Sequence, residues 1–185
     1  MLLVWSCAVP LLASTVAWPS DVPPAEAQIV VQPLRAGLHV VSGAGSNVAV
    51  WHGPDGTVLV GDGTAALAPK LHAAVEKIAP GPVRVVISTH WHPDHTGGNE
   101  HFAGSGSVLV AHDNVRARLS EPQTVATYDL EVPAAAAGAL PIVTFDDALS
   151  LHLNGDRLAA LHVEAAHTDG DLLLWWEDAN VVHVG

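Results

Sequence analysis

One six-residue stretch constrains this chain more than any other feature. From His90 to His95 it reads His-Trp-His-Pro-Asp-His, which places four potential metal ligands in a single loop. His90 and His92 are two residues apart at the predicted end of a strand, so their imidazoles leave the backbone on the same side. Pro93 has a fixed φ that helps turn the chain, which brings Asp94 and His95 back toward the same point. The pattern predicts a metal site built from imidazole nitrogens and a carboxylate.

The segments around this loop predict alternating strands and helices. Residues 83–88 are an almost continuous β-branched run, typical of a strand buried on both faces. Gly97 and Gly98 allow close backbone packing where the next helix begins. Further strands are expected at 34–42, 47–52, 57–61, 107–111 and in several runs after 142, helices at about 65–79 (capped by Thr64) and 114–119, and a loop or loose helix at 121–140. This alternation favours a layered α/β fold.

A histidine-rich surface tract that buffers nickel or copper is the main alternative for the His90–His95 stretch. Such tracts usually lack a buried strand that leads into them. A chance match to His-x-His-x-Asp-His in a chain of this composition has odds of roughly 0.3%. The preceding strand and the following glycines therefore favour a structured site.

Composition excludes several classes of protein. The 185 residues fit one domain or part of one, and no stretch contains the ~18 unbroken apolar residues of a spanning helix. Seven Lys and Arg against 19 Asp and Glu give a formal net charge of −12, which disfavours binding to nucleic acid. Cys7 is the only cysteine. If Cys7 is removed with the leader, any metal must be held by nitrogen and oxygen.

Residues 1–27 are predicted to be a signal peptide or a disordered leader, followed by a domain at 28–185. The leader contains a short apolar segment and ends in Ala25-Glu26-Ala27, whose small residues suit cleavage by signal peptidase. This predicts a periplasmic or secreted protein. No Lys or Arg lies between Met1 and the apolar segment, so a cytoplasmic protein with a disordered leader stays open.

The stretch from Thr89 to Asn99, Thr-His-Trp-His-Pro-Asp-His-Thr-Gly-Gly-Asn, resembles the signature of the metallo-β-lactamase superfamily. The resemblance extends over about 34–185 and implies the αββα sandwich of that family, an α/β fold. It also implies that His90, His92 and His167 bind a first zinc ion, and that Asp94 and His95 begin a second site. Asp62 matches a family aspartate that supports the metal loop.

The resemblance also implies that the second zinc site is incomplete here. The family completes this site with an Asp directly after a Val-Gly strand end and with a later His, whereas this sequence ends at His183-Val184-Gly185. We therefore expect the chain to be an N-terminal fragment holding somewhat more than the first half of the fold. Two zinc ions are expected per full-length chain. His183, and also His72 and His101, are expected to have packing or surface roles.

The resemblance and zinc chemistry together predict a hydrolase for a small-molecule substrate. Three neutral imidazoles leave zinc with its full charge and an open position, which lowers the pKa of a bound water from ~15.7 toward ~7. The hydroxide would attack a carbonyl carbon of a β-lactam, ester, lactone or thioester, with Asp94 as a catalytic proton shuttle. The alternatives are an iron-dependent sulfur dioxygenase of the same fold and a non-catalytic metal-binding fragment.

Overall fold

The computed structural model describes residue 23 and residues 25–125 and 129–185. Most of the predicted leader, including Cys7, lies outside these residues. Its last residue, Ala27, is 7% exposed, and its carbonyl oxygen accepts a hydrogen bond from Lys70 Nζ. Within the described residues, no helix is long and apolar enough to cross a membrane.

The larger sheet has seven strands in the order β1-β2-β3-β4-β5-β6-β9. Strands β1 to β4 pair antiparallel, and β4, β5, β6 and β9 pair parallel. Their bounds are β1 Val30–Pro33, β2 Leu38–Ser42, β3 Val48–Gly53, β4 Gly56–Val60, β5 Val83–Ile87, β6 Val108–His112 and β9 Val143–Phe145. The parallel half brings the carboxyl ends of β5 and β6 to one edge of the sheet, and this edge carries the metal-ligand motif.

The smaller sheet is an antiparallel meander of four strands that follow one another along the chain. These strands are β10 Ala148–Leu153, β11 Asp156–His162, β12 Leu172–Trp176 and β13 Val181–His183. Asn154 (φ 50°) and Gly155 (φ 79°) form the two-residue turn between β10 and β11, as the Asn-Gly pair predicts. A separate two-stranded sheet joins β7 Gln123–Val125 to β8 Leu130–Val132.

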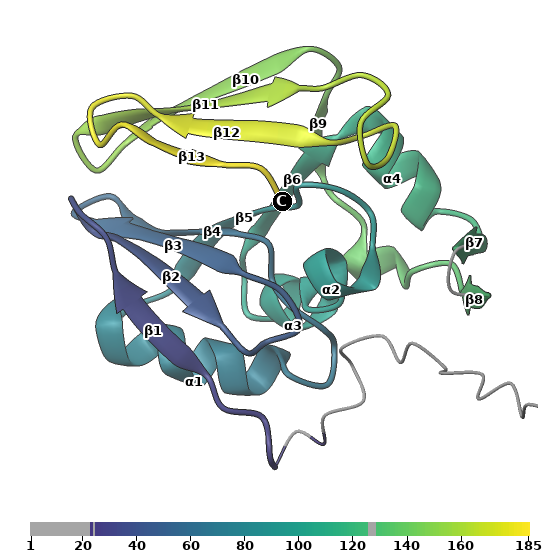
Figure 1. Cartoon of the computed structure of the whole chain (residues 1–185), viewed down its shortest axis with the longest axis horizontal. Helices are drawn as coiled ribbons and strands as arrows, with labels where there is room; N and C mark the ends of the chain where they lie inside the picture. The colour runs from purple at the N-terminus through teal and green to yellow at the C-terminus, as the bar shows by residue number, and fades with distance from the viewer. Residues whose placement is uncertain (1–22, 24, 126–128) are drawn as a thin grey trace, which may run out of the picture.

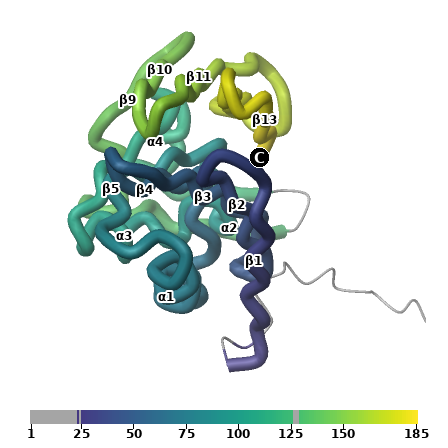
Figure 2. Tube along the Cα trace, turned by 90° about the vertical axis from the view of Figure 1, so that its left-hand side faces the viewer, coloured from purple at the N-terminus to yellow at the C-terminus, as the bar shows by residue number. Residues whose placement is uncertain are grey.

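Helices α1 Ala68–Ile78 and α3 Asn99–Gly104 lie against one face of the larger sheet and the smaller sheet lies against the other, which gives three layers (Figures 1 and 2). The other helices are α2 Pro93–Thr96 and α4 Asp113–Leu119, and a 3-10 turn lies at Ala137–Ala139. The side chains of Leu71, Val75 and Phe102 are buried between the helices and the larger sheet. Those of Trp51, Leu174 and Trp176 are buried between the two sheets. The predicted layered α/β architecture is confirmed.

The structure departs from the sequence predictions mainly at the ends of elements and in short strands. Helix α1 begins at Ala68 instead of residue 65. The Thr64 side chain does not cap the helix, and its carbonyl oxygen instead accepts from the backbone N–H groups of Leu67 and Ala68. Strand β1 was not predicted, and residues 34–37 form a turn in which Gly37 has a φ of 75°. Residues 121–140 contain β7 and β8, where a loop or loose helix was expected.

Polar contacts hold the sheets together at both ends. At one end the two hairpin turns bond reciprocally. The Asp55 N–H donates to Asn154 Oδ1 at 2.9 Å, and the Asn154 N–H donates to Asp55 Oδ2 at 2.6 Å. At the other end the Leu172 N–H donates to the Thr89 carbonyl at 2.9 Å. The second contact fixes the start of β12 beside the residue that precedes the first predicted ligand.

Candidate metal centre

The metal loop, residues 89–98, leaves the carboxyl end of β5 and contains the first group of predicted ligands. His90, His92 and His95 are only 5–6% exposed. His92 is the N-cap of the short helix α2, and Pro93 occupies its first turn, where a proline ring fits without the loss of a backbone hydrogen bond. The loop is therefore part of the protein interior, and its imidazoles are held by packing.

Two glycines let the metal loop lie directly against the segment that follows β4. A Cβ atom at Gly97 would lie 2.5 Å from the Ala65 nitrogen, and one at Gly98 would lie 2.5 Å from the Asp62 carbonyl oxygen. The Gly98 N–H also donates to Asp62 Oδ1 at 3.0 Å. Burial raises the pKa of the Asp62 carboxyl well above its ordinary value, and the Gly98 bond lowers it by less. The expected contact between Asp62 and the metal loop is confirmed.

The distal loop, residues 167–171, is the last part of the connection from β11 to β12 and carries His167. Its shape is set by the Asp171 carboxylate, whose Oδ2 accepts from the His167 N–H at 2.6 Å. The same carboxylate accepts from the Thr168 N–H at 3.1 Å and from its hydroxyl at 2.5 Å. As a residue, His167 itself is exposed. Hydrogen bonds therefore hold the distal loop in place, whereas packing holds the metal loop in place.

Neighbouring elements tie the distal loop to the rest of the fold at Asp169. The Asp169 carbonyl accepts from Asn114 Nδ2 on α4 at 2.7 Å and lies 3.1 Å from His162 Nε2 on β11. Its carboxylate forms an ion pair with Arg118 of α4, with 2.8 Å between Nη2 and Oδ2. Two backbone contacts and one exposed ion pair thus fix the middle of the loop.

The structure brings together the imidazoles of His90, His92 and His167. One nitrogen from each ring can be chosen so that all three lie within 4.8 Å of one another. His92 Nδ1 and His167 Nε2 are 3.0 Å apart, although 75 residues separate them in sequence. Nδ1 of His90 contacts Thr89 Oγ1 at 3.0 Å, so Nε2 is the nitrogen that would face an ion. This arrangement fits a metal bound by three nitrogen atoms.

The electrostatic environment keeps the imidazoles of His90 and His92 available as ligands. Burial, and then the neighbouring His95 and His92, lower the pKa of His90 from 6.5 to about 3. Burial, followed by the proximity of His167, also lowers the pKa of His92. Both rings are therefore neutral near pH 7 and have a lone pair to donate, which is the form that binds metal.

Asp94 and His95 lie beside the three-histidine cluster. Asp94 Oδ2 is 3.2 Å from His95 Nε2, and the ring centroids of His95 and His90 are 4.2 Å apart. Burial by itself raises the pKa of Asp94, but the hydrogen bond and the charge of His95 outweigh it and leave the pKa below its ordinary value. Asp94 Oδ1 is buried and has no hydrogen-bond partner among the described residues. An ionised carboxylate with an unused oxygen thus faces the cluster.

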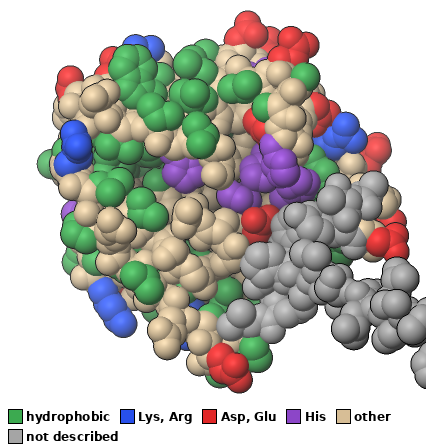
Figure 3. Space-filling view, viewed as in Figure 1, with side chains coloured by type: hydrophobic (Ala, Val, Ile, Leu, Met, Phe, Trp, Pro, Cys, Tyr) green, Lys and Arg blue, Asp and Glu red, His purple; other side chains and the backbone are tan. Residues whose placement is uncertain are grey.

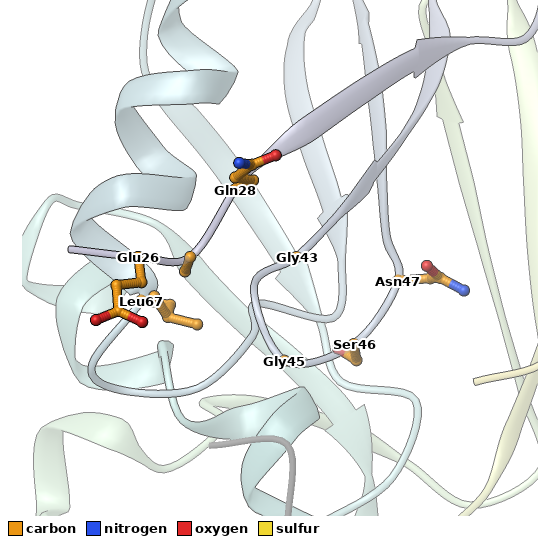
Figure 4. Close-up of a pocket in the computed structure, with 8 residues that line it drawn as sticks. Glu26, Gln28, Gly43, Gly45, Ser46, Asn47 and Leu67 are labelled. Carbon is orange, nitrogen blue, oxygen red and sulfur yellow. The ribbon is translucent and has the colours of Figure 1, made fainter. Parts of the chain in front are cut away.

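These side chains line a cavity of about 370 Å³ at the ends of the two sheets. Figure 3 shows several histidine side chains gathered on this face of the molecule. A larger cavity of about 590 Å³ lies between residues 26–28 and the loop 43–47 (Figure 4). Of the described residues that line that larger cavity, Glu26 alone has a titratable side chain. The chemistry therefore places the candidate centre in the smaller cavity.

All five predicted ligands, His90, His92, Asp94, His95 and His167, line the same cavity. His101, which was expected on the surface, faces His72 and does not line it. Sequence reasoning missed Thr89, whose hydroxyl lies between the Nδ1 atoms of His90 and His95, and Asp171, which shapes the distal loop. In His-Thr-Asp-Gly-Asp a carboxylate follows His167 by four residues, and this spacing indicates a closed turn. The spacing does not show which N–H groups the carboxylate accepts from.

The layered α/β fold thus brings three imidazoles together at the carboxyl end of a buried strand, where they form a candidate metal centre. Residues 41–185 match the family described as the metallo-beta-lactamase superfamily. The chain belongs to this superfamily.

Solved structures of three metallo-β-lactamases share the fold. MEM-A1, a subclass B3 enzyme from a soil metagenome library, is 19% identical with a TM-score of 0.65, over 79% of this chain and 56% of that one. A B3 enzyme with an active-site glutamic acid is 23% identical with a TM-score of 0.69, over 81% and 57%. The enzyme from Pontibacter korlensis is 20% identical with a TM-score of 0.63, over 80% and 67%. The chain thus spans little more than half the length of the first two.

Proposed function

We propose that this chain belongs to a zinc-dependent hydrolase that cleaves a carbonyl substrate such as a β-lactam, ester, lactone or thioester. The observation that carries the proposal is the meeting of three imidazoles beside an ionised carboxylate in one cavity. His90, His92 and His167 would hold the ion. A bound zinc ion supplies a Lewis acid that activates water near neutral pH.

The residues of the chain have distinct roles in this proposal. Asp94 is ionised and has an unused oxygen, so it can accept the proton that an attacking water must lose. His95 pairs with the other oxygen of Asp94 and so orients the carboxylate. Asp94 and His95 are also the two side chains that would begin a second zinc site.

Metal analysis combined with a substrate panel tests this function. Purified protein is expected to contain zinc and to hydrolyse at least one of a chromogenic β-lactam, a nitrophenyl ester, a lactone and a thioester. Asp94→Asn should retain zinc in the three-imidazole site and lose most of its hydrolytic rate. Protein that binds iron and consumes O₂ with a persulfide would support the dioxygenase alternative. Protein that binds zinc without hydrolysing any compound would support a non-catalytic fragment.

We also propose that the protein is exported, on the basis of the apolar segment and the Ala-Glu-Ala tripeptide before residue 28. Expression of the full chain with a C-terminal tag, followed by fractionation and N-terminal sequencing, tests this. A periplasmic product beginning at Gln28 would support export. A cytoplasmic product that retains residues 1–27 would contradict it.

A further inference from the structure

A second pair of imidazoles meets on the helical layer, away from the candidate metal centre. His72 belongs to α1 and His101 to α3, and both are half-buried. His72 Nδ1 and His101 Nε2 are 2.9 Å apart. Neither residue lines the 370 Å³ cavity. The pair is therefore a separate feature that the proposed hydrolase does not use.

The geometry of this pair resembles that found within the candidate centre. There, too, an Nδ1 atom faces an Nε2 atom from a distant segment, at 3.0 Å. Two nitrogens bound to one tetrahedral zinc ion are about 3.4 Å apart when each bond is about 2.05 Å. The rings of His72 and His101 are nearly perpendicular, with an interplanar angle of 84°. A widening of about half an ångström at two half-buried side chains would let both nitrogens bind one ion.

The surroundings restrict the two rings and lower the pKa of one of them. Phe102 is fully buried and contacts both, with ring-centroid distances of 5.1 Å to His72 and 5.2 Å to His101. Partial burial, together with the nearby His72, lowers the pKa of His101. Less side-chain freedom is therefore lost on binding an ion, and fewer protons must be displaced.

We propose that His72 and His101 form a second metal site, which takes one borderline transition-metal ion and links α1 to α3. In the described ranges no third imidazole or carboxylate joins these two nitrogens, so water supplies the other ligands. The site is accordingly weaker than the three-imidazole centre. With two imidazoles and no carboxylate it selects Cu²⁺, Ni²⁺ and Zn²⁺ over Mn²⁺ and Mg²⁺.

Nickel binding to protein that is already loaded with zinc tests this site. The full chain is saturated with zinc, freed of excess zinc, and dialysed against Ni²⁺, after which both metals are counted per chain. Wild-type protein should bind about one nickel ion that His72→Gln and His101→Gln each fail to bind, with the zinc content unchanged. His152→Gln, which removes an exposed histidine from β10, is the matched control and should bind as much nickel as wild type. A Mg²⁺ arm should show no binding.

Thermal unfolding gives a second readout. At about a hundredfold excess of Ni²⁺ over its Kd, the Tm of zinc-loaded wild type should rise by roughly 5–10 °C, and that of both glutamine variants should not. Equal nickel binding by wild type and both variants, or an equal loss in His152→Gln, would overturn the proposal and leave His72 and His101 as a hydrogen-bonded pair. Both measurements compare nickel binding between variants. The comparison therefore tests the His72–His101 site even if the three-imidazole centre binds no zinc.

Discussion

The two loops that supply the three imidazoles are held by different forces. The metal loop is buried, and its glycine backbone lies directly against Asp62 and Ala65. The distal loop exposes His167 and depends on hydrogen bonds from Asp171 and on contacts to α4. Because the two loops are held by different forces, mutations in them should have different effects. Changes in the metal loop should alter stability, whereas changes in the distal loop should alter metal affinity and leave the fold intact.

The largest effect is expected from an added methyl group at Gly98. Gly98→Ala would place a Cβ atom 2.5 Å from the Asp62 carbonyl oxygen, although the φ of −80° suits alanine. The free energy of unfolding should fall by about 3 kcal/mol or more, because the added Cβ would clash with a backbone atom that cannot move away without displacing its strand connection. Urea denaturation of metal-free protein measures it.

Gly104→Ala is the matched control, since the residue ends α3 and no described atom outside its chain neighbours and its own helix backbone lies within 4 Å of a Cβ at that position. It should be neutral or slightly stabilising. Equal urea midpoints for Gly98→Ala and Gly104→Ala would show that the metal loop is not fixed by this contact.

Removal of the distal imidazole should separate affinity from stability most clearly. His167→Ala should weaken zinc binding by more than roughly a hundredfold, because even residues behind a ligand contribute 10–100-fold. Its exposed ring contributes little to the metal-free fold, so the free energy of unfolding should change by less than about 0.5 kcal/mol. Chelator competition and urea denaturation measure the two quantities.

His92→Ala provides the contrast from the metal loop. It should weaken zinc binding to a similar extent, and it should also destabilise the metal-free protein, because it leaves a cavity where a ring only 6% exposed was packed. If His167→Ala destabilises the metal-free protein as much as His92→Ala does, the proposed difference between the loops is wrong.

The same difference explains how much of the site the sequence could predict. Four ligands follow one another at the end of a β-branched run, so local spacing alone indicated the metal loop. His167 is 75 residues from His92, and only the family resemblance connected them. The role of Asp171 depends on which backbone N–H groups a turn presents, and the His72–His101 contact depends on how two helices pack. Neither leaves a periodic signal.

The fold shows the same limit. The central strands and the Asn-Gly hairpin follow from apolar runs and turn residues. Strand β1 and the pair β7 and β8 have only three or four residues each, and they exist because a neighbouring strand offers backbone partners. Helix α1 begins at Ala68 because Pro69 favours the first helical turn and the Thr64 carbonyl, not its hydroxyl, closes the preceding turn.

Asp171 tests whether hydrogen bonds alone position the distal imidazole. Asp171→Ala removes the acceptor for the His167 and Thr168 N–H groups, so zinc affinity should fall about 10–100-fold. Asp171→Asn keeps one acceptor oxygen and should lose clearly less affinity. Chelator competition gives both values, and urea denaturation of the metal-free variants checks that the fold is retained. Unchanged zinc affinity in Asp171→Ala would mean that the loop keeps its shape without this carboxylate.

The smallest effect is expected from the ion pair between Arg118 and Asp169. Both side chains are more than 40% exposed, so solvent screens their attraction, and pairs of this kind contribute about 0–1 kcal/mol. Arg118→Ala also leaves Asn114 Nδ2 on the Asp169 carbonyl, so the loop keeps a backbone anchor to α4. Zinc affinity should therefore fall less than about threefold, which corresponds to well under 1 kcal/mol. This small difference should shrink further in 1 M salt, where exposed charges are screened within about 3 Å. If Arg118→Ala loses as much zinc affinity as Asp171→Ala, and the loss persists in high salt, then the contact with α4 positions His167 and the Asp171 turn does not.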